Sequence, residues 1–228
     1  MDNMKVFTVV AAAVFVGVLG GTYVAITLKE GELKRSVRSI LGGQTPSNAD
    51  DKFAQCRSSQ IAGGTATIGG PFELINSKGE TVTDKDVITE PSLIYFGYTF
   101  CPDVCPLDTT RNAEAVDLLT ERGYSVTPIF ISVDPDRDTP DVVGDFAYNL
   151  HEKMIGLTGT PEQVKAASQA YKTYYKAQDK SDEYYLVDHS TFTYLVTPQD
   201  GFLEFFKRDA TAEQMADTVA CFVDQAAE

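Results

Sequence analysis

The sequence predicts an α/β domain with a central mixed sheet and an N-terminal hairpin, preceded by a transmembrane helix, and three observations support this prediction. In the middle of the chain, apolar runs typical of buried strands alternate with helical patterns, as expected for parallel strands joined by helices. Strand–turn–strand patterns at both ends of this alternation predict antiparallel edges. An uncharged apolar run over residues 6–28 precedes these elements and is long enough to cross a bilayer, for which about 20 residues suffice.

The first half of the domain should contain a hairpin, two buried strands and a long helix. Residues 92–99 are almost entirely apolar or aromatic, as expected of a central strand covered on both faces. Gly123 is a typical helix stop. In order, the expected elements are strands 72–76 and 81–82 around a turn at 77–80, a helical turn at 84–89, strand 92–99, helix 107–122 and strand 126–133.

The second half should begin with a charged loop, residues 134–140, in which Thr139 and Pro140 fit the N-cap and first turn of a helix. Capping boxes at Thr160 and Thr211 predict the starts of two further helices. In order, the expected elements are helix 141–150, a short strand at 154–157, a helix from 160 to about 176, a polar loop at 178–183, strands 184–187 and 191–197 interrupted at 188–190, a turn at 198–201, strand 202–206, and a helix from 211 to about 225.

Four segments are expected along the chain. They are a short tail at 1–5, a transmembrane anchor at 6–28, a tether and lead-in at 29–61, and the globular domain at 62–228. The apolar run is longer than the 7–15 apolar residues typical of a signal peptide and no small-residue cleavage site follows it, which favours a retained anchor. The Lys and Arg residues after the run, counted alone, would place the domain in the cytoplasm, but this rule weakens for long translocated domains.

Composition limits the classes of function. The chain has 228 residues, of which 43% are hydrophobic and 23% charged, as expected for one globular domain plus an extension. Its net charge of −14 would repel nucleic-acid phosphates, so no nucleic-acid partner is expected.

Two cysteines, Cys101 and Cys105, follow the strand predicted at 92–99 and precede the next helix. On a helix, a separation of four residues places both sulfurs on one face. A helix N-terminus lowers the pKa of a nearby thiol, so at least one thiolate should be available to attack a disulfide or bind a metal. The alternative is a structural disulfide, which would stabilise little because the loop it closes is very short.

A thiol pair at the first central strand–helix junction of such a sheet predicts a thioredoxin-like fold. In open α/β sheets, functional sites lie beyond the carboxyl ends of the strands. The cysteine pair, the loop at residues 134–140 and His189 could therefore converge there.

Four separate blocks make the chain recognisable. They are residues 95–106 (YFGYTFCPDVCP), residues 131–140 (ISVDPDRDTP), residues 157–159 (LTG) and residues 187–191 (VDHST). Together they resemble the Sco/SenC family, over residues 70–223. The resemblance implies a membrane-anchored copper protein with a thioredoxin-like fold, in which Cys101, Cys105 and His189 are the copper ligands.

The same resemblance implies a function, a partner and a location. The family delivers copper to the binuclear centre of cytochrome c oxidase, reduces the cysteines of that centre, or does both. The implied partner is the copper-accepting oxidase subunit, with a thiol reductase or another copper carrier as a further partner. The implied location is the bacterial inner membrane, with a single span and the domain in the periplasm, or the equivalent intermembrane-space side in mitochondria.

The residue types also suit copper chemically. Two thiolates and one imidazole form a soft ligand set that favours Cu(I), although either copper oxidation state is a candidate cargo. Structural zinc almost always takes four protein ligands, and no fourth Cys or His is evident. No proline adjoins His189, whereas thioredoxin-type oxidoreductases carry a cis-proline at that strand entry, so metal binding is favoured over general disulfide exchange. His151 is expected to be a surface or capping histidine.

Four other residues have candidate roles. Asp134 and Asp138 are expected to tune the thiols or to dock a partner, and the alternative is a solvated loop with local Asp-turn bonds. Cys56 and Cys221 are expected to form a disulfide, which is the simplest fate of two remaining thiols in an oxidising compartment. That bond would close a long loop and stabilise the fold by about 4 kcal/mol through chain entropy.

Other functions remain open at this stage. A thiol–disulfide reductase would need Cys101 and Cys105 but not His189. A peroxidase relative would need an arginine beside a reactive cysteine, for which Arg111 and Arg137 are candidates. A copper or redox sensor is a further alternative, while the leading hypothesis is a metallochaperone rather than an enzyme.

Overall fold

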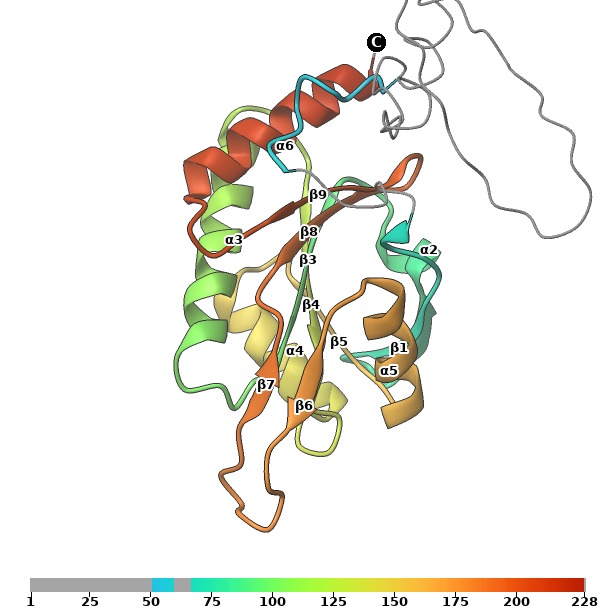
Figure 1. The fold of residues 1–228 in the computed structure, drawn as a ribbon, viewed down its shortest axis with the longest axis vertical. Coiled ribbons are helices and arrows are strands. Elements are labelled where there is room, and N and C mark those ends of the chain that lie inside the picture. Colours follow the sequence, from blue (N-terminus) through green and yellow to red (C-terminus); the bar gives the residue numbers. More distant parts are fainter. Residues whose placement is uncertain (1–50, 60–66, 228) are drawn as a thin grey trace, which may run out of the picture. The chain divides into compact units, whose positions relative to one another are not determined.

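The computed structural model describes residues 51–59 and 67–227, and its centre is a seven-stranded sheet (Figure 1). The strand order is β2-β1-β5-β4-β3-β8-β9. β3, β4 and β5 are parallel, and the remaining pairs are antiparallel. The predicted mixed sheet is therefore confirmed. The strands are β1 (Glu73–Asn76), β2 (Thr81–Thr83), β3 (Ser92–Gly97), β4 (Thr127–Ser132), β5 (Ile155–Thr158), β8 (Thr193–Thr197) and β9 (Gly201–Phe206).

Five helices of the described residues surround this sheet. They are α2 (Asp84–Val87), α3 (Val104–Glu121), α4 (Pro140–Leu150), α5 (Pro161–Ala170) and α6 (Ala212–Ala226). α3 and α6 lie side by side (Figure 1) and share an apolar core that includes Val116, Leu119, Val219 and Phe222. Capping boxes are present at Thr160 and Thr211, as the sequence predicts.

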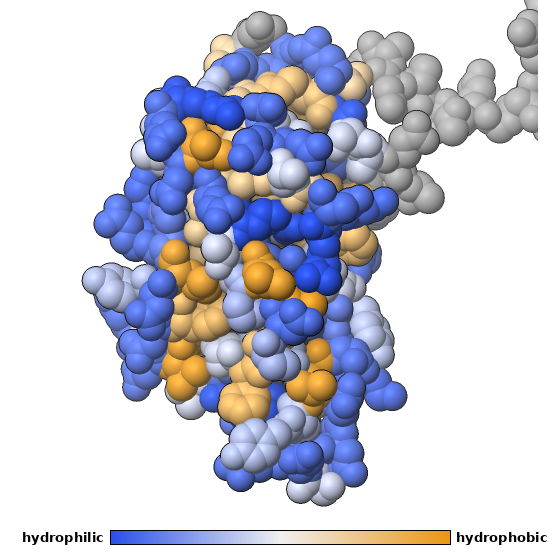
Figure 2. Space-filling model, turned by 90° about the vertical axis from the view of Figure 1, so that its left-hand side faces the viewer, coloured by the Kyte–Doolittle hydropathy of each residue, from blue (hydrophilic) through white to orange (hydrophobic). Residues whose placement is uncertain are grey.

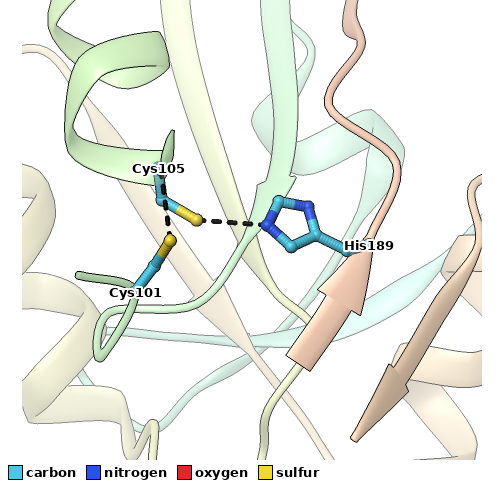
Figure 3. A group of neighbouring side chains, drawn as sticks. All are labelled: Cys101, Cys105 and His189. Carbon is cyan, nitrogen blue, oxygen red and sulfur yellow. Dashed lines mark hydrogen bonds between the residues drawn. The ribbon is translucent and has the colours of Figure 1, made fainter. Parts of the chain in front are cut away.

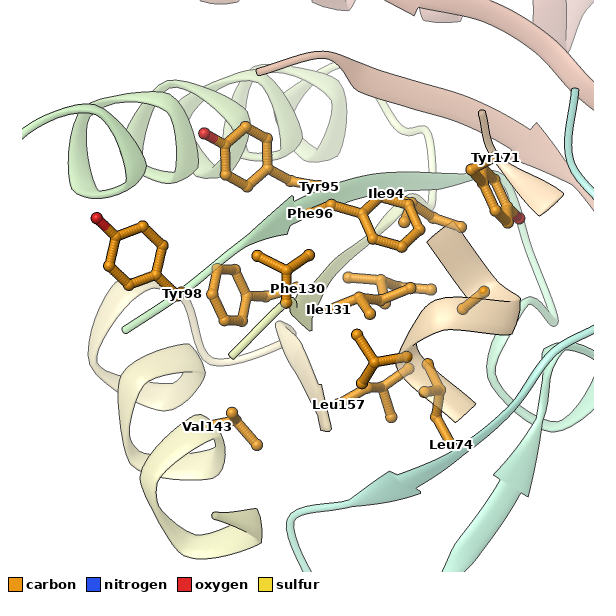
Figure 4. Packing of buried hydrophobic residues seen from close by; sticks show 14 of the residues in the cluster. Leu74, Ile94, Tyr95, Phe96, Tyr98, Phe130, Ile131, Val143, Leu157 and Tyr171 are labelled. Atoms are coloured by element: carbon orange, nitrogen blue, oxygen red, sulfur yellow. The ribbon is translucent and has the colours of Figure 1, made fainter. Parts of the chain in front are cut away.

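The central strands are buried along their whole length. All six residues of β3 are buried, and five of the six in β4. Figure 4 shows their side chains packed with residues of neighbouring elements, such as Leu74, Leu157 and Tyr171. This burial fixes the carboxyl end of β3, from which the cysteine loop departs.

A short two-stranded ribbon stands apart from the main sheet. β6 (Tyr175–Ala177) pairs antiparallel with β7 (Val187–His189), and Tyr175 lies opposite His189. Two expectations for this region are wrong. The helix expected to reach about residue 176 ends at Ala170, because Lys172 adopts a positive φ of 53° and the chain turns into β6. The strand expected at 184–187 begins only at Val187 and includes His189 instead of stopping before it.

Residues 51–59, here called the N-terminal strap, pack on α6 and β9. Cys56 and Cys221 are joined by a disulfide, with their Cα atoms 5.7 Å apart. The ring of Phe53 packs on that of Phe222, with centroids 5.3 Å apart. The buried Glu204 carboxylate accepts hydrogen bonds from the backbone N–H groups of the two serines that end the strap, at 2.9 and 3.2 Å.

The anchor predicted at residues 6–28 lies outside the described residues. Within residues 51–59 and 67–227, none of the helices is both long and apolar enough to span a bilayer. The described residues, 51–59 and 67–227, belong to one compact unit.

Candidate metal centre

The cysteine loop joins β3 to α3. The helix begins at Val104, three residues earlier than expected, so Cys105 lies in its first turn while Cys101 precedes the helix. The expectation that both sulfurs share a helix face is therefore wrong. The reason is local, because the Cys101 sulfur accepts the Cys105 backbone N–H at 3.3 Å and so supplies an acceptor for the helix N-terminus.

Cys101, Cys105 and His189 come together although the histidine is 84 residues from Cys105 (Figure 3). Their ligand atoms all lie within 4.8 Å of one another, and Cys105 Sγ is 3.3 Å from His189 Nε2. Both cysteines are buried free thiols, and the histidine is half-buried. Among the described residues, these three form the only such group of Cys, His, Asp or Glu side chains.

The imidazole of His189 is oriented by its neighbours. Nδ1 lies 2.8 Å from the Ser190 carbonyl oxygen, which accepts a hydrogen bond when Nδ1 carries the proton. This tautomer leaves the lone pair of Nε2 directed at the cysteines, as a metal ligand requires. The rings of Tyr95 and Tyr98 meet the imidazole edge-on, with centroids 6.1 and 5.8 Å away.

Gly97, the last residue of β3, makes room for the Cys105 sulfur. A Cβ at this position would lie 3.1 Å from Cys105 Sγ and 2.8 Å from a ring carbon of Tyr95. Both distances are shorter than ordinary van der Waals contact. Only glycine therefore lets the helix N-terminus approach the strand this closely.

The two thiols have opposite pKa shifts. The hydrogen bond from Cys105 is the main cause that lowers the pKa of Cys101 to about 4, and backbone N–H groups at the helix start lower it further. The same hydrogen bond, together with burial, raises the pKa of Cys105. The two thiols therefore titrate as a pair, in which loss of the first proton is favoured and loss of the second is opposed.

The two aspartates of the loop after β4 bind protein groups. The Asp138 carboxylate accepts the backbone N–H of Thr99 at 2.9 Å and the hydroxyls of Thr99 and Ser132, each at 2.5 Å. Burial raises the pKa of Asp138 in spite of these bonds. Asp134 accepts hydrogen bonds from Arg137 at 2.6 Å and from the Tyr185 hydroxyl at 2.7 Å. Both carboxylates thus fasten the loops around the cysteines, and the alternative of a solvated loop does not describe them, since each is at most 2% exposed.

The two arginines considered as peroxidase partners have other contacts. Arg137 binds Asp134 and stacks on aromatic rings, and Arg111 donates to the carbonyl oxygens of Lys207 and Arg208. His151 is the C-cap residue of α4 and lies 3.2 Å from Asp117. No role was predicted for Gly97, Tyr98 or Tyr185. Gly97 and Tyr98 lie within the motif at residues 95–106, and Tyr185 lies shortly before the motif at residues 187–191, so only these positions could have drawn attention to them.

Large exposed hydrophobic side chains are common on the segments that carry the three candidate ligands. They are Phe100, Leu107, Tyr174, Tyr184 and Leu186. Figure 2 shows one face of the molecule, on which hydrophobic residues lie in separate groups within a hydrophilic surface.

Comparisons with known proteins identify a family. The family model described as SCO1/SenC matches residues 61–224. Protein SenC of Rhodobacter capsulatus is 60% identical over 174 residues, which are 76% of this chain and 78% of the relative. The mitochondrial SCO1 homolog 1 of Arabidopsis thaliana is 42% identical over 68% of this chain, and the match spans 47% of that longer protein.

Solved structures share the fold. Arabidopsis thaliana ScoI with copper bound superposes with a TM-score of 0.65 at 40% identity, covering 69% of this chain and 99% of the other. Bradyrhizobium japonicum ScoI with copper bound gives a TM-score of 0.61 at 36% identity, covering 67% and 98%. The family model covers well over half of the sequence and the thioredoxin-like α/β fold agrees, so the chain belongs to the SCO1/SenC family.

Proposed function

We propose that this chain is a copper chaperone that binds copper through Cys101, Cys105 and His189 and prepares the binuclear copper centre of cytochrome c oxidase. The observation that carries the proposal is the convergence of three soft donor atoms within 4.8 Å of one another. Two thiolates and one imidazole suit Cu(I), which accepts a three-coordinate site. Copper-bound structures of similar proteins from Arabidopsis thaliana and Bradyrhizobium japonicum support copper as the cargo.

The chain's own residues prepare this site in three ways. The lowered pKa of Cys101 favours its thiolate, the form that binds a metal, so less free energy is needed to deprotonate this ligand when copper binds. The Ser190 carbonyl holds the proton of His189 on Nδ1 and leaves Nε2 free. Burial of both sulfurs limits the access of water and oxidants to them.

The proposal extends to location and partner. Residues 6–28 form a single transmembrane anchor, and residues 29–61 connect it to the domain at 62–228, which faces the periplasm or the equivalent mitochondrial compartment. The disulfide between Cys56 and Cys221 supports an oxidising compartment, in which such bonds persist. The copper-accepting subunit of the oxidase is the proposed partner, and exposed Phe100, Leu107 and Tyr184 beside the site offer apolar contact area for it.

The ligand assignment predicts the effect of His189→Ala. The reduced protein should bind one Cu(I), and the variant should bind it more than about 100-fold more weakly, since changes outside the ligand set already cost 10–100-fold in metal affinity. Competition with a chromophoric Cu(I) chelator measures this affinity. His151→Ala, which removes the other histidine, is the matched control and should bind like the parent. Equal affinities for the parent and His189→Ala would refute the ligand assignment.

A second candidate function, thiol–disulfide reduction of the oxidase cysteines, is favoured by the lowered pKa of Cys101. Such a reaction needs a thiolate that attacks the disulfide and a neighbouring thiol that resolves the mixed disulfide. Reduction of an oxidised peptide from the copper-accepting subunit tests it on the same variants. Reduction that persists in His189→Ala would support the reductase, whereas an inactive parent protein would exclude it.

A further inference from the structure

His189 is held in place by an element that is only loosely part of the sheet. The ribbon β6–β7 has no ladder of hydrogen bonds to the seven-stranded sheet. Most of its backbone bonds are internal, such as the Gln178 N–H to the Leu186 carbonyl at 2.8 Å, and the Val187 backbone also bonds the Tyr98 side chain. Side-chain contacts from the rest of the domain must therefore determine where the ribbon places the imidazole.

Arg137 supplies the most central of these contacts. Its guanidinium carbon lies 3.6 Å from the ring centroid of Tyr185, which leads into β7. The same carbon is 4.8 Å from the ring of Phe100 and 5.8 Å from that of Tyr98, both in the segment that leads to Cys101. One cation thus lies between the segment that carries the sulfurs and the segment that carries the histidine, within the distance at which cation–π attraction acts.

A buried carboxylate fixes this cation. The Arg137 Nε–H donates to one Asp134 oxygen at 2.6 Å, and the Tyr185 hydroxyl donates to the other at 2.7 Å. Asp134 is only 2% exposed, so this ion pair is screened far less than a surface pair. Arg137 also reaches the Glu183 carbonyl oxygen at 3.4 Å, which adds a backbone contact to the ribbon.

The remaining Arg137 nitrogen, NH2, is buried without a hydrogen-bond partner among the described residues. Cation–π contacts with the surrounding aromatic rings partly compensate for this missing hydrogen bond. The nearby ring pair Phe100–Tyr184, with centroids 5.8 Å apart, also joins the two segments, but both rings are largely exposed. The Asp134–Arg137–Tyr185 cluster, here called the clip, is therefore the buried charged connection between the two segments, and Val187 adds apolar packing in the core beside it.

We propose that the clip positions the ribbon and thereby decides whether His189 completes the copper site. With the clip closed, copper meets two sulfurs and one imidazole. With the clip open, the ribbon moves away with His189, and only the two sulfurs retain the metal. This inference rests on the proposed copper function. It states that the clip controls how readily copper dissociates from the site.

The test removes the ion pair as a unit. The double variant Asp134→Asn, Arg137→Met leaves no buried charge without a partner, and its asparagine can still accept the Tyr185 hydroxyl bond. Cu(I) affinity should fall about 10- to 100-fold, the range typical of residues that orient metal ligands. Tyr185→Phe, which removes one hydroxyl and keeps the ring, is the milder second variant and should show a smaller loss.

The decisive measurement is made in the His189→Ala background. If the clip acts through the imidazole of His189, the His189→Ala variant has no imidazole to position, so the clip variants should cause no further loss of Cu(I) affinity in it. The matched control is Arg122→Met, Asp217→Asn, which removes another Arg–Asp pair with a 2.6 Å contact, between the end of α3 and α6. It should leave Cu(I) affinity unchanged in both backgrounds.

Amide hydrogen exchange of the metal-free protein separates this inference from the proposed function. In the clip variants, the ribbon amides, such as that of Gln178, should exchange about tenfold faster, while the amides of β3 and β4 keep their rates. Faster ribbon exchange together with an unchanged copper affinity of His189→Ala would refute His189 as a ligand and with it the effect of the clip on copper, while the positioning of the ribbon by the clip would be supported. Unchanged ribbon exchange, or an equal loss of affinity with and without His189, would overturn the clip.

Discussion

At the scale of single residues, side chains of rare metal-binding types can be recognised in the sequence, whereas residues required by close packing in the folded chain cannot. Cys101, Cys105 and His189 stood out because free thiols and an imidazole are uncommon in this chain, and the structure brings them together. Gly97 could not be predicted as a site residue. Its requirement arises because Cys105, Tyr95 and Phe130 crowd one position on β3, and that proximity exists only in the folded chain.

Gly97→Ala should therefore damage the site. The added methyl group would overlap Tyr95 and press on Cys105 Sγ, so the helix N-terminus must move. Cu(I) affinity should fall about tenfold by disturbed ligand orientation, and the free energy of unfolding should fall by about 1–3 kcal/mol through overpacking. Chelator competition and urea unfolding measure the two effects.

Gly156→Ala is the matched control for that prediction. Its methyl group would meet the Val143 carbonyl oxygen at 2.3 Å, against α4 and away from the sulfurs. It should lower the free energy of unfolding while the copper affinity of the folded protein stays near that of the parent. Equal losses of affinity in the two variants would show that Gly97 has no special role at the site.

Asp138 gives a prediction on pH. Burial raises its pKa above the ordinary value of 3.8, so at pH values between 3.8 and the raised pKa the folded protein holds a proton that the unfolded chain has released. Through that window, this group makes the free energy of unfolding decrease as pH rises. Below pH 3.8 both states are protonated, and above the raised pKa the penalty is constant.

Asp138→Asn removes this titration, so the difference in the free energy of unfolding between parent and variant should change with pH in that acid window and then level off. Urea unfolding at a series of pH values measures it. Asp145→Asn, at an exposed position in α4, is the control. A difference between the parent and Asp138→Asn that stays constant from acid to neutral pH would contradict the raised pKa.

At the scale of elements, patterns with strong local signals were predicted best. The capping boxes at Thr160 and Thr211 open α5 and α6 as expected. The end of α5 could not be predicted because residues 171–176 carry no glycine or proline. The turn there depends on a positive φ at Lys172 and on the pairing of β6 with β7 across the intervening loop. The N-terminal strap was likewise beyond prediction as an element, because its order comes from long-range contacts with Glu204 and Phe222.

The strap disulfide should contribute strongly to stability. It joins residues 165 positions apart, and chain entropy gives such a loop a value of about 4–5 kcal/mol. Cys56→Ser, Cys221→Ser should lower the free energy of urea unfolding by up to that amount. Cu(I) affinity at 25 °C should not change, because Cys101 and Cys105 belong to a different group of contacts. A double variant as stable as the parent would mean that the strap contacts alone hold this segment.

At the scale of the whole molecule, the order of strands and helices was enough to predict the sheet, because crossover connections between parallel strands follow few rules. Each of the two predicted hairpins, one before and one after the alternating elements in the sequence, forms an antiparallel edge of the sheet: β1–β2 on one side and β8–β9 on the other. The separate ribbon could not be foreseen, since its strands have three residues each and depend on the clip for their place. The fold and the convergence of the three candidate ligands were thus predictable, and the contacts that surround these residues were not.

The length of α3 has a mechanical consequence. The helix has 18 residues and is therefore about 27 Å long, with Cys105 in its first turn. Beyond its other end, Arg122 and Tyr124 bind α6, the helix to which the strap is covalently fastened. The chain that arrives from the N-terminus is thus attached at one end of a rigid rod, and the sulfurs lie at the other. The two sulfurs are thereby held about one helix length from the fastened strap, so a protein that approaches the candidate copper site reaches the opposite end of α3 from the strap.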